Sequence, residues 1–225
     1  MMLLSHAQLI YQDEKLFDNL DLPFFPQQWT CILGQSGVGK TSLLRMIAGL
    51  SAGEVKGTLH VNPQDIAYMA QSDLLLPWLS VLNNVMIGTI LRGEKIPPEK
   101  KNTAIQLLEK MGLSEALHKK PRELSGGMRQ RVALARTLFD DKNIILMDEP
   151  FSSLDAPTKK KLYGLFKKYL KNKTILFITH DIVEALQLGD KLFVLSGKPA
   201  ILKPVHTKNA DEILHLLTEN VLCAE

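Results

Sequence analysis

The feature that most constrains this chain is the glycine-rich octapeptide GQSGVGKT at residues 34–41. An apolar run precedes it at residues 29–33, and a stretch with helical spacing follows at residues 42–50. A strand, a tight loop and a helix are therefore expected in this order. The pattern G-x-x-x-x-G-K-[ST] is that of a loop whose backbone N–H groups, with the N-terminus of the next helix, surround a phosphate. The sequence thus predicts a site for the phosphates of a nucleotide rather than a plain glycine-rich turn.

Individual residues of this loop have expected roles. Lys40 would reach the β- and γ-phosphates, and the hydroxyl of Thr41 would ligate Mg²⁺. The glycines allow the tight turn that points successive N–H groups into one concavity. The remaining residues expected to contact the phosphates are Gly34, Gln35, Ser36, Gly37, Val38, Gly39 and Ser42.

Two further buried strands are expected to end in polar residues. The run at residues 143–150 is almost continuously apolar and ends with Asp148 and Glu149, as in a parallel strand buried on both faces. Asp148 is expected to hold the metal, and Glu149 to accept a proton from water that attacks the γ-phosphate. The strand at 174–180 ends in His180, which we interpret as functional because it lies at the same sheet edge as the acids.

Two other features are ambiguous when taken alone. Ser125, Gly126 and Gly127 stand where a helix begins, which is both a second anion site and a common helix cap. Tyr11 lies 23 residues before Gly34, the first residue of the loop. Its ring can stack on adenine or can simply belong to a strand, and its position does not decide between these.

Length and composition limit the remaining possibilities. The 225 residues fit one large domain or a core with an insert. The net charge of +3 is too small to indicate nucleic-acid binding. Cys31 and Cys223 form no disulfide or zinc pattern, so a reducing cytosol is expected. Neither a signal peptide nor an apolar run of spanning length is evident, so a membrane role would act through a partner.

Taken together, these motifs resemble the ATP-binding cassette (ABC) family over essentially the whole chain. The matching pieces are GQSGVGKTS as Walker A, Gln71 as the Q-loop, LSGGMRQR as the signature, ILMDEP as Walker B, SLD as the D-loop and His180 as the switch histidine. Walker A has Thr41 and Ser42 where the family most often has Ser then Thr. Both carry a hydroxyl, so the metal ligand is retained at Thr41.

The resemblance implies a fold. It is an α/β P-loop NTPase (RecA-like) core with a parallel sheet, an N-terminal antiparallel β subdomain and an inserted helical subdomain. The whole chain, 1–225, would be a single ABC ATPase domain. Residues 1–71 and 131–225 would form the nucleotide-binding core, and residues 72–130 the helical subdomain.

The resemblance also implies ATP and Mg²⁺ as cofactors, and a dimer in which two ATPase subunits pair head-to-tail. Ser125, Gly126 and Gly127 would then cover the γ-phosphate held by the other subunit, and Asp155 would cross the same interface. Gln71 would contact the metal and couple it to the helical insert. His180 would hydrogen-bond the γ-phosphate, and Tyr11 would stack on adenine.

Three kinds of ABC protein compete as interpretations. A soluble cassette of DNA repair or translation would carry coiled-coil insertions, zinc-ligand cysteines or two cassettes, and a regulatory cassette would have lost Glu149, His180 or Lys40. The segment QSDLLLPWLSVLNNV instead resembles the part of importer ATPases that docks a permease. With EPFSSLDAPTK and LSGKP it is most similar to the nitrate/sulfonate/taurine branch, which includes carriers of thiamine-type precursors.

The importer interpretation brings its own partners and location. We expect a second ATPase subunit, forming a homodimer, and transmembrane permease subunits. A periplasmic or extracellular solute-binding protein would take part indirectly, and no nucleic acid would bind. The chain is expected at the cytoplasmic face of the inner membrane as a peripheral protein.

Overall fold

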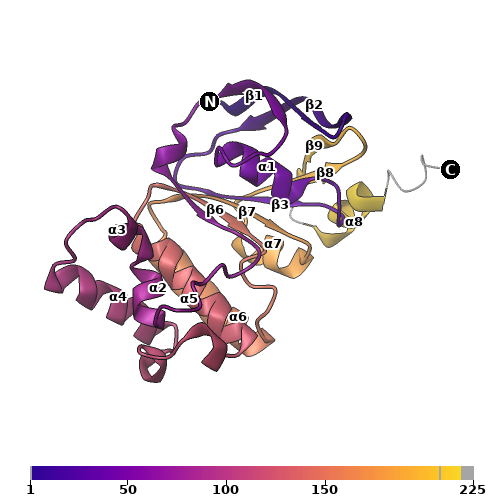
Figure 1. Cartoon of the computed structure of the whole chain (residues 1–225). Helices are drawn as coiled ribbons and strands as arrows, with labels where there is room; N and C mark the ends of the chain where they lie inside the picture. Colours follow the sequence, from indigo (N-terminus) through magenta and orange to yellow (C-terminus); the bar gives the residue numbers. More distant parts are fainter. Residues whose placement is uncertain (1, 208, 219–225) are drawn as a thin grey trace. The chain divides into compact units, whose positions relative to one another are not determined.

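The computed structural model describes residues 2–207 and 209–218, and the chain divides into two units (Figure 1). The first unit comprises Met1–Ile66, Asn143–Glu149 and Leu170–Glu225, and the second comprises Ala67–Lys142 and Pro150–Tyr169. These bounds differ from those of the subdomains expected from the sequence, and the predicted subdomain bounds stay a prediction. The second unit takes in the whole helix α5 (Gly126–Phe139), since this helix packs on other helices of that unit.

An antiparallel sheet opens the first unit. Its strand order is β2-β1-β4, with β1 Met2–Tyr11, β2 Glu14–Pro23 and β4 Glu54–Leu59. Gln12 and Asp13 both have positive φ, 49° and 64°, as in the two-residue turns that match strand twist. The second strand therefore begins directly after this turn, at Glu14. It ends at Pro23, because proline has no N–H for the ladder.

A second sheet carries the predicted buried strands of the first unit. Within the first unit its strand order is β6-β7-β3-β8-β9. The strands are β3 Trp29–Leu33, β6 Ile144–Asp148, β7 Thr174–Thr179, β8 Lys191–Ser196 and β9 Ile201–Pro204. The first four strands are parallel, and β9 is antiparallel to β8. Every residue of β3 and β6 is buried, which explains their uninterrupted apolar pattern. The sequence did not predict β9.

Three helices of the first unit cover this sheet. They are α1 Lys40–Ile47, α7 Ile182–Leu188 and α8 Ala210–Thr218, and the short 3₁₀ turn η1 is Pro63–Asp65. Helix α1 lies between the two sheets and packs on β6, while α7 packs on β3 and β7 and α8 on β8 (Figure 1). The apolar spacing of residues 209–222 predicts a terminal helix, which is confirmed as far as Thr218. Residues 219–222 lie outside the described residues, as does Cys223.

The second unit is mainly helical. The chain enters it through β5 Ile66–Met69, and its helices are α2 Val81–Val85, α3 Ile87–Leu91, α4 Pro98–Lys110, η2 Ser114–Ala116, η3 Pro121–Glu123, α5 and α6 Ala156–Tyr169. The sequence pattern predicts one helix over residues 81–91 with Ser80 as its N-cap, but Met86 (φ −88°, ψ 5°) interrupts it. Ser80 caps α2 as predicted, its hydroxyl accepting from the N–H of Asn83.

Helix α5 is central to the packing of the second unit. Helix α5 contacts both α2 and α4. Its apolar spacing predicts five buried residues, of which Val132, Ala133, Leu134 and Ala135 are fully buried and Leu138 is half-buried. No helix in the part of the chain that the structure describes has the length and apolar character needed to cross a membrane.

Candidate functional site

The glycine-rich loop at residues 34–41, called the phosphate loop below, connects β3 to α1 as its sequence predicts. Gly37 and Gly39 have φ of 81° and 102°, which side chains with a Cβ rarely adopt. At Gly34 a Cβ would lie 2.6 Å from the carbonyl oxygen of Leu195, so glycine is required by the neighbouring strand β8. Gly39 is the N-cap of α1 and offers no side-chain cap. The first N–H groups of α1 therefore remain available to an anion.

Lys40 spans the base of this loop. Its Nζ donates to the carbonyl oxygens of Gly34 at 2.7 Å and Gln35 at 2.8 Å. The residue is only 7% exposed. Burial lowers the pKa of the ammonium group, while the nearby carboxylates of Glu149 and Asp148 raise it. An ammonium has three donors, so two of them position the group and one is left for a ligand oxygen.

Asp148 ends β6 beside the start of α1. The hydroxyl of Thr41 hydrogen-bonds the Asp148 carboxylate, whose pKa is raised chiefly by burial and lowered by this bond. Its second oxygen, Oδ2, is buried and has no hydrogen-bond partner within the described residues. A buried oxygen of this kind ordinarily has a partner. The pair of a hydroxyl and a carboxylate oxygen fits the hard oxygen ligands that Mg²⁺ takes.

The side chains near Thr41 and Asp148 limit the kind of metal that this site can bind. Over residues 2–207 and 209–218, no group of three or more His, Cys, Asp or Glu side chains is placed to hold a metal ion. Mg²⁺ differs from metals that need such cages, because it is usually bound by one or two protein groups together with phosphates and water. Thr41 and Asp148 therefore suit a metal ion that is also bound by a phosphate group.

Glu149 and His180 come together at the ends of neighbouring strands. Strands β6 and β7 are parallel and paired, so the residues that follow them lie at one sheet edge. His180 Nδ1 is 3.1 Å from Glu149 Oε1. The Glu149 side chain is 15% exposed and the His180 side chain 65% exposed. Glu149 has φ 48°, a conformation that is costly for a residue with a Cβ and concentrates at functional sites.

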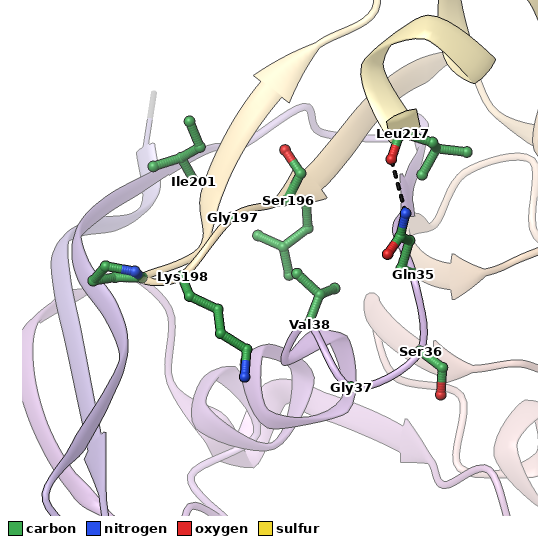
Figure 2. A pocket seen from close by; sticks show the side chains of 11 residues that line it. Gln35, Ser36, Gly37, Val38, Ser196, Gly197, Lys198, Ile201 and Leu217 are labelled. Carbon is green, nitrogen blue, oxygen red and sulfur yellow. Dashed lines mark hydrogen bonds between the residues drawn. The ribbon is translucent and has the colours of Figure 1, made fainter. Parts of the chain in front are cut away.

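A cavity of about 600 Å³ lies on the β8 side of the phosphate loop (Figure 2). Residues 35–38 of the loop, the β8–β9 connection and Leu217 of α8 line it. Gln35 Nε2 donates to the carbonyl oxygen of Leu217 at 3.0 Å, which ties α8 to the loop. Ser196 and Lys198 were not predicted from the sequence. They line this cavity because β8 pairs with β3. No local sequence pattern indicates that pairing, so the two residues could not be predicted.

Tyr11 is the last residue of β1 and lies in the first unit with the phosphate loop. Its side chain is 47% exposed. The ring is next to the β1–β2 turn, where Tyr11 pairs with Glu14. An exposed aromatic ring at this position is accessible to a planar ligand.

The remaining predicted residues, Gln71, Ser125, Gly126, Gly127 and Asp155, belong to the second unit. Ser125 is the N-cap of α5, its hydroxyl accepting from the N–H of Met128 at 3.3 Å. A Cβ at Gly127 would be 3.3 Å from the carbonyl oxygen of Ser153, so the start of α5 lies against the loop that precedes α6. The exposed Asp155 carboxylate accepts from the Thr158 N–H, and hydrogen bonding to Thr158 lowers its pKa.

Comparison with known proteins shows the family. The sequence profile described as ABC transporter matches residues 17–152. An uncharacterized ABC transporter ATP-binding protein of Haemophilus influenzae is 42% identical, over 87% of this chain and 82% of that protein. The chain belongs to the ABC transporter family. It is an ABC ATPase, as the sequence motifs predicted.

Other relatives of this ABC ATPase are import proteins. The aliphatic sulfonates import ATP-binding protein of Delftia acidovorans is 38% identical, over 84% of this chain and 78% of that protein. The taurine import ATP-binding protein of Jannaschia sp. is 41% identical, over 80% of this chain and 70% of that protein. The predicted resemblance to the sulfonate and taurine branch is confirmed by these relatives.

Solved structures confirm the predicted fold class of the ABC ATPase. A dimeric structure of the bacterial ABC transporter cassette MJ0796 has a TM-score of 0.75 at 31% identity, over 86% of this chain and 94% of that one. A dimeric post-hydrolysis state of the same cassette, bound to ADP and Pi, has a TM-score of 0.78 at 29% identity, over 92% and 100%.

Proposed function

We propose that this chain is the ATP-hydrolysing subunit of an ABC importer that drives uptake of a small solute through a separate membrane permease. The solute would be of the nitrate, sulfonate, taurine or thiamine-precursor type. The observation that carries the proposal is the similarity to import proteins for aliphatic sulfonates and taurine. These relatives do not favour the alternative, a non-transport ABC ATPase of DNA repair or translation.

ATP would be held by the phosphate loop of the first unit. The N–H groups of residues 34–42 would surround the phosphates, and the third N–H of Lys40 would bind the β- and γ-phosphates. Two bonds to loop carbonyls already hold this ammonium in place, so little side-chain entropy would be lost on binding.

Mg²⁺ would be held by Thr41, Asp148 and Gln71, with the buried Oδ2 of Asp148 gaining the partner that it lacks among the described residues. The metal would neutralise charge on the β- and γ-phosphates. Glu149 would accept the proton of the attacking water, and its bond to His180 orients both side chains. His180, mostly exposed, would hydrogen-bond the γ-phosphate.

A second ABC ATPase subunit, most simply another copy of this chain, would complete each site. Ser125, Gly126 and Gly127 at the N-terminus of α5 would contact the γ-phosphate bound by the partner, because a helix N-terminus favours an anion. Asp155 would approach the same interface. The dimeric structures of the similar cassette support this arrangement.

The permease would contact the segment that follows Gln71. Two large apolar side chains of this segment are exposed, Leu74 at 62% and Trp78 at 67%. Tryptophan is enriched among the residues that dominate binding at protein interfaces, and exposed apolar surface marks interaction sites. Contact with a permease would place the chain at the cytoplasmic face of the inner membrane, with a solute-binding protein involved indirectly and no nucleic acid.

The docking proposal is tested by co-purification from membranes. We expect Leu74→Asp combined with Trp78→Ala to weaken binding of the membrane partner about 10- to 100-fold, since one aromatic hot spot such as Trp78 carries about 2 kcal/mol. The ATPase rate of the isolated chain should stay near that of the wild type. Leu50→Asp is the matched control, because Leu50 is a 58% exposed leucine of the first unit. Equal recovery of the partner with both variants would contradict the docking surface.

Tyr11 gives a separate test of the nucleotide site. Tyr11→Ala is expected to raise the KM for ATP about fivefold, the value of one aromatic stacking contact, and to leave kcat nearly unchanged. Tyr11→Phe keeps the ring and serves as the control, with a KM close to that of the wild type. Steady-state kinetics and thermal unfolding check this. A KM that stays constant in Tyr11→Ala while the protein loses stability would assign Tyr11 to the strand alone.

A further inference from the structure

Two arginines of α5 attach the exposed loop at residues 73–79 to this helix. Arg129 Nε donates to Asp73 Oδ2 at 2.9 Å. The two Nη atoms of Arg136 donate to the carbonyl oxygens of Asp73 at 2.6 Å and Leu74 at 2.9 Å. The two arginines are seven residues apart, which is about two turns of an α-helix, so they project from one face of α5.

Asn84 of α2 holds the other end of this loop. It is fully buried, and its Oδ1 accepts from the N–H of Leu76 at 2.7 Å. Its Nδ2 is within 3.2 Å of the carbonyl oxygens of Leu76, Leu79 and Ser80. A segment without regular secondary structure thus has its backbone polar groups bonded by side chains from two helices. Such bonding holds one loop conformation.

The attachment fixes an unfavourable conformation. Leu74 has φ 45°, which is costly for a residue with a Cβ and persists only where surrounding contacts hold it. Arg136 bonds the carbonyls of Asp73 and Leu74, on both sides of this φ angle. The result is that the leucine side chain is presented outward, 62% exposed, on the same loop as Trp78.

The attachment also reaches the N-terminus of α5. Arg129 Nη1 donates to the carbonyl oxygen of Leu124 at 3.0 Å, and Leu124 directly precedes the N-cap Ser125. One guanidinium therefore bonds both Asp73 of the loop and the residue next to the proposed contact with the partner's ATP. Its planar fork allows it to bond both at once.

We propose that Arg129 and Arg136 are positioning residues that make residues 73–79 move together with the N-terminal end of α5. The inference rests on the proposed function, because it needs Ser125 to respond to ATP and the Leu74–Trp78 surface to contact a permease. Neither arginine is among the groups proposed to bind ATP. Their loss should therefore spare hydrolysis by the isolated chain and break its coupling to the membrane partner.

The first experiment compares the ATPase rate of the isolated chain with that of the complex purified from membranes. In Arg129→Ala combined with Arg136→Ala, the change in rate caused by the partner should fall about fivefold or more, the range of mutational effects on coupling. The rate of the isolated chain should stay within about twofold. Arg122→Ala, at an exposed arginine of η3, is the control and should behave as the wild type. Arg129→Lys and Arg136→Lys keep the charge and should recover part of the coupling.

The second experiment uses hydrogen exchange on the isolated chain carrying Glu149→Gln, with ATP and Mg²⁺. With both arginines present, ATP should slow exchange at residues 124–128 and at 73–79 together. In the double variant only residues 124–128 should respond. Thermal unfolding confirms that each variant is folded.

Two results would overturn the inference. In the first, the double variant keeps the full change in ATPase rate caused by the partner, and ATP still slows exchange at residues 124–128 and 73–79 together. In the second, the double variant loses ATPase activity equally as the isolated chain and in complex with the membrane partner. Failure of wild-type chain to bring down any membrane partner would instead count against the proposed function, and the exchange experiment would still test the two arginines.

Discussion

Glu149→Gln is expected to retain ATP binding and to lose about 10²- to 10⁴-fold in turnover, the usual contribution of a positioned general base. Glutamine keeps the size of the side chain and removes the ability to accept a proton. If ATP closes two subunits around each other, the closed state should then accumulate. Size-exclusion chromatography of the variant with ATP and Mg²⁺ should show a dimer, where the wild type with ADP shows a monomer.

The control for this variant is a glutamate of the same unit outside the site. Glu54 lies on β4 and is exposed, so Glu54→Gln should hydrolyse ATP like the wild type and form no trapped dimer. Only monomer in the Glu149→Gln sample, at a concentration where both proteins bind ATP, would contradict the dimer proposal. Undiminished hydrolysis would remove Glu149 from its proposed role.

Lys40→Ala is expected to lower turnover about 10²- to 10³-fold, as the loss of one preorganised donor to a developing charge does. The change removes the ammonium and also leaves the carbonyls of Gly34 and Gln35 without the donor that they have now. ATP affinity should fall as well, because the ammonium and its two bonds to the loop carbonyls are lost. ATPase assays and equilibrium nucleotide binding measure the two effects separately.

Lys40→Met separates the charge from the packing. Methionine fills much of the same space without the charge, so it should be as inactive as alanine but closer to the wild type in thermal stability. Lys56→Ala, at an exposed lysine of β4, is the control for a lysine outside the site. Turnover near the wild-type level in Lys40→Ala would refute the phosphate-site assignment.

Much of the fold follows from local pattern. The fully buried strands β3 and β6 were predicted because apolar runs of this length, bounded by polar residues, are typical of parallel strands. The helix α1 and the caps at Ser80 and Ser125 were predicted for the same local reasons. Strand β9 and the interruption at Met86 were missed, because neither has a distinct sequence signal.

Contacts between distant residues could not be predicted. Arg129 and Asp73 are 56 positions apart, and Glu149 and His180 are 31 apart. The order β6-β7-β3-β8-β9 places strands side by side that are far apart in the chain. Pairings of this kind depend on which apolar faces meet, and a single sequence does not contain that information in any local window.

The sequence by itself indicated the family, which the comparisons confirm, and it predicted phosphate binding by the loop, because glycine, lysine and threonine at fixed spacing are needed to surround a phosphate. Only the tertiary structure decided how the loop is held. Strand β8 requires glycine at residue 34, and the backbone carbonyls of residues 34 and 35 hold the Lys40 ammonium. The physical reason is that a motif specifies donors and turn geometry locally, whereas burial and the direction of each donor arise when distant strands pack against it.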